Sequence, residues 1–299
     1  MERKNVSATT RVLGVIGDPI EHSLSPLLHN HVLGKLGLDY IYVAYHVRGE
    51  LAAGVGAAMR TLGLSGLNVT HPHKQTLRDQ MEVLSDEANA VGAVNTVGWD
   101  SSGRLAGHNT DVAGFEKSLE VRGLLDRLQG SRAVILGAGG AARAVLYSLA
   151  HNGVSRFTVG YRPLFDNAEE LAGWFLYHFP NVQLSLVPFE ETHDLANALF
   201  DATITINVTP LGMAPMLDRS PLPDGIVPTK ETIVYDLIYT PECTPLLKRA
   251  KEIGCQTLNG LDMLIIQGME SLEWWLGREV GWREMLDELR GVLGEALKK

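Results

Sequence analysis

The sequence predicts an α/β protein of two domains, each built around a parallel β-sheet. The chain has 299 residues, enough for two domains of about 150 residues, each with its own hydrophobic core. Strand-like runs alternate with helix-like runs through both halves, as in βαβ units. In the second half a glycine-rich turn, Gly137–Ala142, stands between an apolar run and an alanine- and leucine-rich run. This order is typical of a Rossmann-type domain.

The first half opens with an apolar run at Arg11–Gly17, which predicts a buried strand ending in a turn at Asp18 and Pro19. Ser25 directly precedes Pro26, and serine at the N-cap with proline at the first helical position predicts a helix from Pro26 to about Gly37. Tyr40–Val47, rich in β-branched and aromatic residues, predicts the second strand.

A second helix is predicted from Glu50 to Gly63 because five apolar residues recur on one helical face: Leu51, Val55, Ala58, Met59 and Leu62. Ser65–Thr70 predicts the third strand. The rest of this half predicts a short helix, two short strands around a turn and a helix that leads into the second domain, at 86–92, 93–99, 104–110 and 112–123.

The run Ala133–Leu136 predicts the first strand of the second domain. Gly137 permits a tight turn, Gly139 lets the backbone approach a pyrophosphate, and Ala142 keeps the following helix close to the sheet. A glycine-rich turn in an ordinary α/β domain is the alternative. The context favours a dinucleotide site, since a further strand, SRFTVGYR, ends 25 residues after Gly137.

The end of that strand bears on the choice of nucleotide. NAD sites usually place an acidic residue about 20 residues after the first glycine, to bind the ribose 2′-hydroxyl. Here Gly160, Tyr161 and Arg162 stand at the strand end, with no acid before Asp166. A guanidinium suits a 2′-phosphate, so we expect NADP. A surface arginine that caps the strand end is the alternative, and Asp166 keeps NAD possible.

The remaining elements of the second half alternate in the same way. Helices and strands are predicted at 168–179, 181–189, 194–200, 202–210 and 232–239, and a helix opened by Thr244 and Pro245 stops at Gly254. Two amphipathic helices, 261–277 and 282–299, end the chain, and we expect their apolar faces to pack on the first domain. The predicted domains are therefore 1–110 completed by 259–299, and 111–258.

Composition and net charge argue against several classes of function. A formal net charge of −9 argues against a nucleic-acid-binding surface. No apolar run is as long as a membrane span, the polar N-terminus shows no signal-peptide core, and Cys243 and Cys255 match no metal or redox spacing. We expect a cytoplasmic protein, monomeric or homodimeric, that acts on a small molecule, with both cysteines in packing roles.

Polar residues cluster where predicted strands end or turn, at Ser23 and Ser25, Asn68 to Lys74, Asn95 and Thr96, Asn109 to Asp111, and Gln267. Ligands of open parallel sheets bind beyond the carboxyl ends of the strands. The amides and hydroxyls suggest a small polyhydroxylated ligand. Taken singly, each such residue is as often a cap or turn former.

Lys74 is the one cation among these clusters. A lysine can act as the proton donor of a ketone reduction if burial lowers its pKa or if it exchanges protons with solvent. Asp111 would orient it, although a carboxylate also raises the pKa of an amine. The pairs His29/His31 and His71/His73 have no further ligand at suitable spacing, so no metal site is predicted.

The chain resembles the shikimate dehydrogenase family. Eight motifs carry the resemblance in order from residue 22 to residue 268: HSLSP, NVTHPHK, AVNT, HNTD, GAGGAARA, NVTPLGM, DLIYTPECTPLL and NGLDMLIIQG. The resemblance implies reversible, NADP-dependent reduction of 3-dehydroshikimate to shikimate in aromatic amino-acid biosynthesis.

The resemblance also implies residue roles. Lys74 and Asp111 are similar to the family's catalytic pair. The substrate-binding residues would be Ser23, Ser25, Asn68, Thr70, Asn95, Asp111, Tyr239 and Gln267. The cofactor-binding residues would be Gly137, Gly139, Gly140, Ala141, Arg162, Thr209, Met213, Tyr239 and Gly260.

One departure from the family pattern leaves an alternative open. The family's NADP loop commonly reads Asn-Arg-Thr followed by a second basic residue, whereas this chain reads Tyr161-Arg162-Pro163 and then Leu, Phe, Asp and Asn. A quinate/shikimate dehydrogenase able to use NAD is therefore the alternative enzyme. A non-catalytic nucleotide-binding regulatory protein is the alternative of another class, against which the intact Lys74 and Asp111 argue. His71, where the family usually has an aliphatic residue, bears on no catalytic role.

Overall fold

The computed structural model describes residues 6–298; the polar residues 1–5 and Lys299, on which the sequence-based expectations for the two ends of the chain partly fall, lie outside them. The described chain divides into a first unit, residues 6–114 with 265–298, and a second unit, residues 115–264. Among the described residues, no helix is long and apolar enough to cross a membrane.

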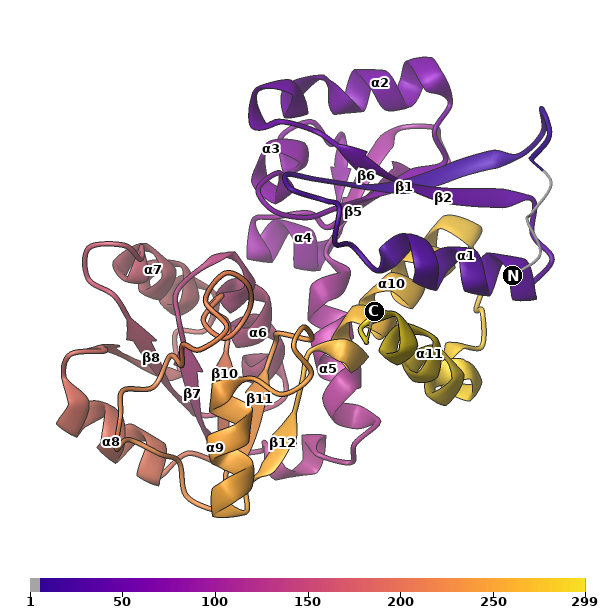
Figure 1. The fold of residues 1–299 in the computed structure, drawn as a ribbon. Helices are drawn as coiled ribbons and strands as arrows, with labels where there is room; N and C mark the ends of the chain where they lie inside the picture. Colours follow the sequence, from indigo (N-terminus) through magenta and orange to yellow (C-terminus); the bar gives the residue numbers. More distant parts are fainter. Residues whose placement is uncertain (1–5, 299) are drawn as a thin grey trace. The chain divides into compact units, whose positions relative to one another are not determined.

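The first unit is built on a six-stranded sheet of order β2-β1-β3-β5-β6-β4. Figure 1 labels β1, β2, β5 and β6 of this sheet. Pairing is parallel within β2-β1-β3 and between β4 and β6, but β5 runs antiparallel to both β3 and β6. The strands are β1 (Arg11–Gly17), β2 (Tyr40–His46), β3 (Gly66–Val69), β4 (Val83–Leu84), β5 (Thr96–Trp99) and β6 (Leu105–His108). The prediction of a parallel sheet is thus wrong for β5. A short turn at residues 100–104 returns the chain from β5 to β6, and β5 also runs antiparallel to β3.

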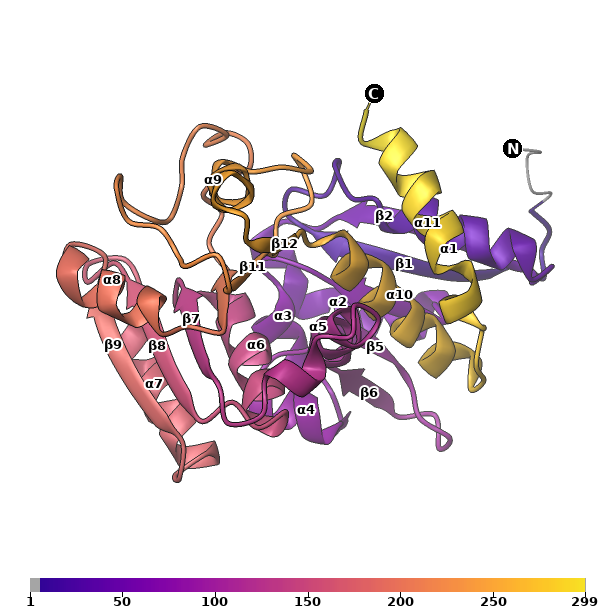
Figure 2. The same cartoon turned by 90° about the horizontal axis from the view of Figure 1, so that it is seen from below.

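Helices cover both faces of this sheet. One face packs against η1 (Gly49–Gly54), α2 (Val55–Leu62), α3 (Lys74–Arg78) and α4 (Asp86–Val91). On the other face lie α1 (Ser25–Lys35) and α10 (Leu261–Leu276), whose Trp275 donates from Nε1 to the Val97 carbonyl at 3.0 Å. Helix α11 (Trp282–Ala296) lies against α1 (Figure 2). Glu288 of α11 pairs there with His31 at 2.8 Å. The predicted return of the C-terminal helices to the first domain is confirmed.

Two local predictions in this unit are wrong. The single apolar face predicted for residues 50–63 is not buried as a whole. A 3₁₀ turn, with three residues per turn rather than 3.6, precedes α2, so Ala52 is buried in place of Leu51. Ala58 and Leu62 are exposed. Ser25 is not the N-cap of α1. It is the first helical residue, after Leu24, and its hydroxyl bonds with Tyr42.

The second unit carries a wholly parallel sheet of order β12-β11-β10-β7-β8-β9. This order is the doubly wound Rossmann arrangement, with β7 at the reversal of strand order. The strands are β7 (Arg132–Leu136), β8 (Arg156–Tyr161), β9 (Gln183–Pro188), β10 (Ile204–Asn207), β11 (Ile233–Asp236) and β12 (Gln256–Leu258). The predicted Rossmann-type domain is confirmed.

Two apolar clusters hold helices on the two faces of this sheet. One joins α5 (Thr110–Glu120), α6 (Gly140–His151) and α7 (Ala168–His178) to the inward residues of the strands. The other joins α8 (Thr192–Phe200) and α9 (Pro245–Ile253) to the opposite face. Short η2 (Leu125–Arg127) follows α5. Cys255 is buried as predicted, but Cys243 is exposed, because it lies in the loop before α9.

Candidate active site

Three strand ends of the first unit meet at one edge of its sheet. Asn68, near the end of β3, pairs in register with Thr96 at the start of β5, and Thr96 pairs with His108 at the end of β6. Because β5 is antiparallel to its neighbours, its first residues lie beside the last residues of β3 and β6. The segments after Asn68, before Thr96 and after His108 therefore converge, and each carries polar side chains.

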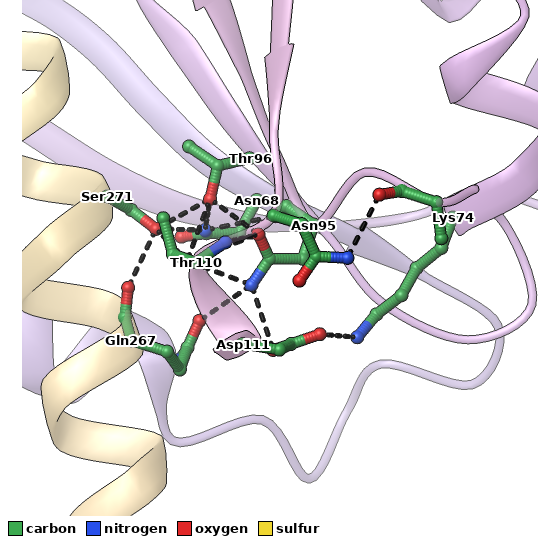
Figure 3. A network of polar contacts seen from close by, with 10 residues as sticks. Asn68, Lys74, Asn95, Thr96, Thr110, Asp111, Gln267 and Ser271 are labelled. Carbon is green, nitrogen blue, oxygen red and sulfur yellow. Dashed lines mark hydrogen bonds and ion pairs between the residues drawn. The ribbon is translucent and has the colours of Figure 1, made fainter. Parts of the chain in front are cut away.

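Lys74 and Asp111 form the charged centre of this edge. Lys74 Nζ lies 2.5 Å from Asp111 Oδ2, with the two side chains 32% and 16% exposed. Lys74 begins α3, and Asp111 lies in the first turn of α5, where the helix dipole favours an anion. Asn95 Nδ2 donates to Asp111 Oδ1 at 2.9 Å, so both carboxylate oxygens are held (Figure 3). The pair leaves the ammonium oriented and partly open to solvent.

Amides and hydroxyls surround this pair. Asn95 is buried, and its Oδ1 accepts from the Thr110 backbone N–H at 2.8 Å, which fixes the direction of the amide because a backbone N–H can only donate. Asn95 Nδ2 also donates to Gln267 Oε1 at 3.3 Å. Asn68 Nδ2 donates to the Asn95 backbone carbonyl at 3.1 Å. Asn68 and Gln267 are thereby joined with Lys74, Asn95 and Asp111 in one hydrogen-bonded cluster.

The other predicted substrate residues are Ser23, Ser25, Thr70 and Tyr239. Ser23 and Ser25 stand at the start of α1, where Ser23 Oγ accepts from the Ser25 backbone N–H at 3.3 Å. Half-buried Thr70 follows β3, and its backbone N–H donates to Ile16. Tyr239 is in the second unit.

Sequence reasoning missed Tyr42 and Ser271, two buried residues that hold this cluster together with the predicted Thr110. The Tyr42 hydroxyl donates to Asn68 Oδ1 at 2.7 Å and also meets the Ser25 side chain. Thr110 and Ser271 hydrogen-bond directly within the cluster. Only Ser271 carried a signal in the sequence, since it stands four residues after Gln267 and hence on the same face of a helix.

The histidines have structural surroundings. His29 stacks on Tyr42 with ring centroids 4.0 Å apart, and burial lowers its pKa to about 4. His73 bonds to the Val47 carbonyl, and His31 pairs with Glu288. Within residues 6–298, no group of three or more histidine, cysteine, aspartate or glutamate side chains is arranged to hold a metal.

In the second unit the loops after β7 and β10 touch at the reversal of strand order. Gly137 has φ +111°, and a Cβ there would lie 2.6 Å from Thr209 Cγ2. Glycine is therefore required both for the backbone angle and for the close approach of Thr209. In doubly wound sheets the ligand binds outside the carboxyl ends of the strands at this point.

The start of α6 fits a pyrophosphate. Gly139 is the N-cap and no side chain caps the helix, so its first N–H groups point outward. A Cβ on Gly139 or Gly140 would meet no atom within 4 Å, so both backbones border open space. Half-buried Ala141 lies in the first turn of the same helix. An uncapped N-terminus beside bare backbone suits an anion.

Arg162 is paired with Asp166. Arg162 Nη2 lies 3.3 Å from Asp166 Oδ1, and the Arg162 backbone N–H donates to Asp166 Oδ2 at 2.8 Å. The arginine side chain is 46% exposed and the aspartate 11%. A basic and an acidic side chain thus lie together at the end of β8, where Rossmann domains bind the ribose of the nucleotide.

A buried carboxylate organises the loops that carry Met213, Tyr239 and Gly260. Asp236 accepts from Asn207 Nδ2 at 3.0 Å, the Ile238 backbone N–H at 3.1 Å and the Thr244 hydroxyl at 2.6 Å. Burial raises the pKa of Asp236 to about 6, against these three donors. A Cβ on Gly260 would lie 1.9 Å from the Leu237 carbonyl oxygen, so these loops pack backbone to backbone.

Comparison with known proteins identifies the family. Residues 15–97 match the model described as "Shikimate dehydrogenase substrate binding domain". A shikimate dehydrogenase (NADP(+)) from Salinibacter ruber is 41% identical over 288 residues, which cover 95% of this chain and 99% of the relative. The chain belongs to the shikimate dehydrogenase family. The assignment predicted from the eight motifs is confirmed.

Solved structures of the family show the same fold. Shikimate 5-dehydrogenase from Listeria monocytogenes, in complex with shikimate and NAD, has a TM-score of 0.87 at 35% identity and covers 97% of this chain and 99% of its own. A quinate dehydrogenase from Corynebacterium glutamicum, in complex with NAD, has a TM-score of 0.83 at 31% identity and covers 96% of this chain and 99% of its own. Both branches of the family thus resemble this chain.

Proposed function

We propose that the protein is an NADP-dependent shikimate dehydrogenase, which reversibly reduces 3-dehydroshikimate to shikimate in aromatic amino-acid biosynthesis. The observation that carries the proposal is the cluster in which Asn95 links the Lys74–Asp111 pair to Asn68 and Gln267. This cluster sits in a chain 41% identical to a shikimate dehydrogenase (NADP(+)).

The cluster provides the acid-base chemistry of the reaction. NADPH, when bound, supplies the hydride that reduces a ketone. Lys74 Nζ gives a proton to the carbonyl oxygen as it becomes a hydroxyl, and it takes the proton back in the reverse direction. Asp111 holds the ammonium in place through Oδ2, and Asn95 holds Asp111 through Oδ1.

The amides give the site its preference for hydroxyls. Buried amides that lose a hydroxyl partner are left unpaired, which disfavours analogues without that hydroxyl. The ring hydroxyls are proposed to contact Asn68, Thr70, Asn95, Asp111 and Gln267. The substrate carboxylate is proposed to bind to Ser23 and Ser25, with Tyr239 nearby. The family resemblance supports these roles.

The nucleotide is proposed to bind at the second unit. The start of α6 at Gly139, Gly140 and Ala141 would receive the pyrophosphate, and Arg162 the 2′-phosphate. The loops after β7 and β10, in contact at Gly137 and Thr209, would lie next to the pyrophosphate. The nicotinamide would be bordered by Met213, Tyr239 and Gly260. The bare backbone at Gly139 and Gly140 supports the first of these roles.

A quinate/shikimate dehydrogenase able to use NAD is the second candidate. Asp166 favours the use of NAD, because its carboxylate already pairs with the Arg162 guanidinium and would repel a 2′-phosphate. The Listeria monocytogenes structure in complex with shikimate and NAD supports the same alternative.

One set of assays distinguishes these candidates. Steady-state rates are measured for shikimate and for quinate, each with NADP and with NAD, from the absorbance of the reduced nicotinamide. The proposal expects the highest kcat/KM for shikimate with NADP. A higher value for quinate, or for NAD, would support the second candidate, and no turnover in any combination would support a regulatory nucleotide-binding protein.

We propose a cytoplasmic location as well. Both cysteines, Cys243 and Cys255, are free thiols, as in a reducing compartment.

A further inference from the structure

Ser271 lies inside the polar cluster of the first unit. It is on α10, one turn after Gln267, and it is 0% exposed. Its Oγ lies 2.9 Å from Asn68 Nδ2, 2.7 Å from Thr96 Oγ1 and 3.1 Å from Thr110 Oγ1 (Figure 3). One hydroxyl from the C-terminal part of the chain thus meets side chains from β3, β5 and α5.

The direction of these hydrogen bonds follows from their partners. Ser271 Oγ donates to the Gln267 backbone carbonyl at 2.9 Å, and a carbonyl can only accept. The single hydroxyl proton of Ser271 is therefore used within its own helix. Toward the cluster, Ser271 Oγ acts as an acceptor for the Asn68 amide and for a threonine hydroxyl.

This acceptor completes the hydrogen bonds of the Asn68 amide. Asn68 Nδ2 also donates to the Asn95 carbonyl at 3.1 Å and reaches Thr96 Oγ1 at 3.1 Å, so both of its protons have partners in the protein. Asn68 Oδ1 accepts from the Tyr42 hydroxyl at 2.7 Å and has one further lone pair. Asn68 accordingly meets a ligand as an acceptor only.

We propose that Ser271 is a positioning residue that holds Asn68 in this acceptor orientation, and that it thereby sets which ring hydroxyl of the substrate is recognised. The inference rests on the proposed function, because it assumes a hydroxylated ring at this site. Ser271 also keeps α10 in register with the strand ends, which places Gln267 one turn earlier on the helix near Asn95.

The test compares Ser271→Ala with the volume-conserving Ser271→Cys. A thiol is a weak acceptor, so both variants lose the hydrogen bond to Asn68 while only the first loses volume. We expect KM for shikimate to rise on the order of 10-fold in both variants, as when one ordering hydrogen bond is lost. We expect kcat to stay within about twofold, because Lys74 and Asp111 are untouched.

A matched control separates positioning from general loosening. Ser118 is equally buried, donates to the Phe115 carbonyl and bonds to the Tyr235 hydroxyl, but it belongs to the second unit. Ser118→Ala is expected to lower Tm about as much as Ser271→Ala and to leave KM for shikimate unchanged.

Analogues of shikimate supply the decisive readout. For analogues that each lack one ring hydroxyl other than the oxidised one, the ratio of kcat/KM for shikimate to kcat/KM for the analogue is measured. For one analogue, this ratio is expected to fall in Ser271→Ala, because that hydroxyl has lost its ordered acceptor. Unchanged ratios for all analogues, or a normal KM in Ser271→Cys, would overturn the role of Ser271. A wild-type protein that does not oxidise shikimate would instead overturn the proposed function and the inference with it.

Discussion

Lys74 Nζ and Asp111 Oδ2 lie 2.5 Å apart, although 36 residues separate them in the chain. Lys74 begins the short helix after β3, and Asp111 lies in the first turn of the helix after β6. The antiparallel β5 between these strands brings their ends to the same edge. The pair is therefore a consequence of sheet topology as much as of the two residues.

The first prediction concerns Lys74→Ala. Loss of a general acid costs about 10²- to 10⁴-fold in rate, so kcat should fall by that amount. KM for shikimate should change little, because the amides and hydroxyls of the cluster remain. Steady-state kinetics measures both values. Lys35→Ala is the control, since Lys35 also pairs with a carboxylate, Glu288, but lies on the outer end of α1. A Lys74→Ala variant with more than about half of the wild-type kcat would exclude an acid-base role.

The sequence predicts the fold class and most of its elements because periodicity and caps are local. Thr244 is the N-cap of α9 as expected, and Gly254 ends that helix with φ +94°. The spacing of apolar residues, by contrast, does not show whether β5 runs parallel or antiparallel to β3. It also does not reveal the 3₁₀ turn that leaves Leu51 exposed.

The site is predictable to a similar extent. Asn68, Asn95 and Asp111 follow from polar residues at predicted strand ends, and the family motifs add their roles. Tyr42 and Ser271 were not predicted, because their importance comes from packing between distant segments. Tyr42 in a β-strand and Ser271 in a helix have unremarkable local patterns, and only the folded chain brings both to Asn68.

The second prediction is a pair of glycine substitutions. Gly260→Ala should destabilise the second unit strongly, because the added Cβ would lie 1.9 Å from the Leu237 carbonyl oxygen, which is backbone and cannot move aside freely. Gly173→Ala should instead stabilise the protein by roughly 0.5–1 kcal/mol, since Gly173 is exposed within α7 and a Cβ there meets no atom within 4 Å. Thermal unfolding of both variants measures these effects. Equal Tm values for the two would contradict the close approach at Gly260.

The third prediction concerns Asp236 and pH. Burial raises the pKa of Asp236 from 3.8 to about 6, so the folded state binds more protons than the unfolded state between these values. The stability that this group contributes is thus complete below pH 3.8 and is lost as pH rises through 6, by about 3 kcal/mol in all.

Asp236→Asn removes this titration and keeps the hydrogen bonds, because the amide oxygen can accept from Asn207 and Ile238 and the amide nitrogen can donate to Thr244 Oγ1. The free energy of unfolding of the variant, relative to wild type, should therefore increase between pH 4 and pH 7. Denaturant titrations at several pH values measure the difference. Parallel pH profiles for the two proteins would show that Asp236 titrates alike in the folded and unfolded states.

The last prediction concerns the choice of cofactor. Arg162 is placed to meet a 2′-phosphate, but Asp166 holds its guanidinium at 3.3 Å and its backbone N–H at 2.8 Å. A charge-assisted hydrogen bond to a phosphate contributes roughly 1.5–3 kcal/mol, or about 10- to 150-fold in affinity. Repulsion by Asp166 offsets part of this gain, so the preference for NADP should be modest.

Arg162→Ala should raise KM for NADP and leave KM for NAD nearly unchanged, because NAD has no 2′-phosphate. Asp166→Asn should act in the opposite direction, since it removes the repelling charge while its amide oxygen can still accept from the Arg162 backbone. Values of kcat/KM for both cofactors in the wild type and the two variants test the argument. If Arg162→Ala weakens both cofactors equally, or if Asp166→Asn lowers the preference for NADP, the pair does not select the nucleotide.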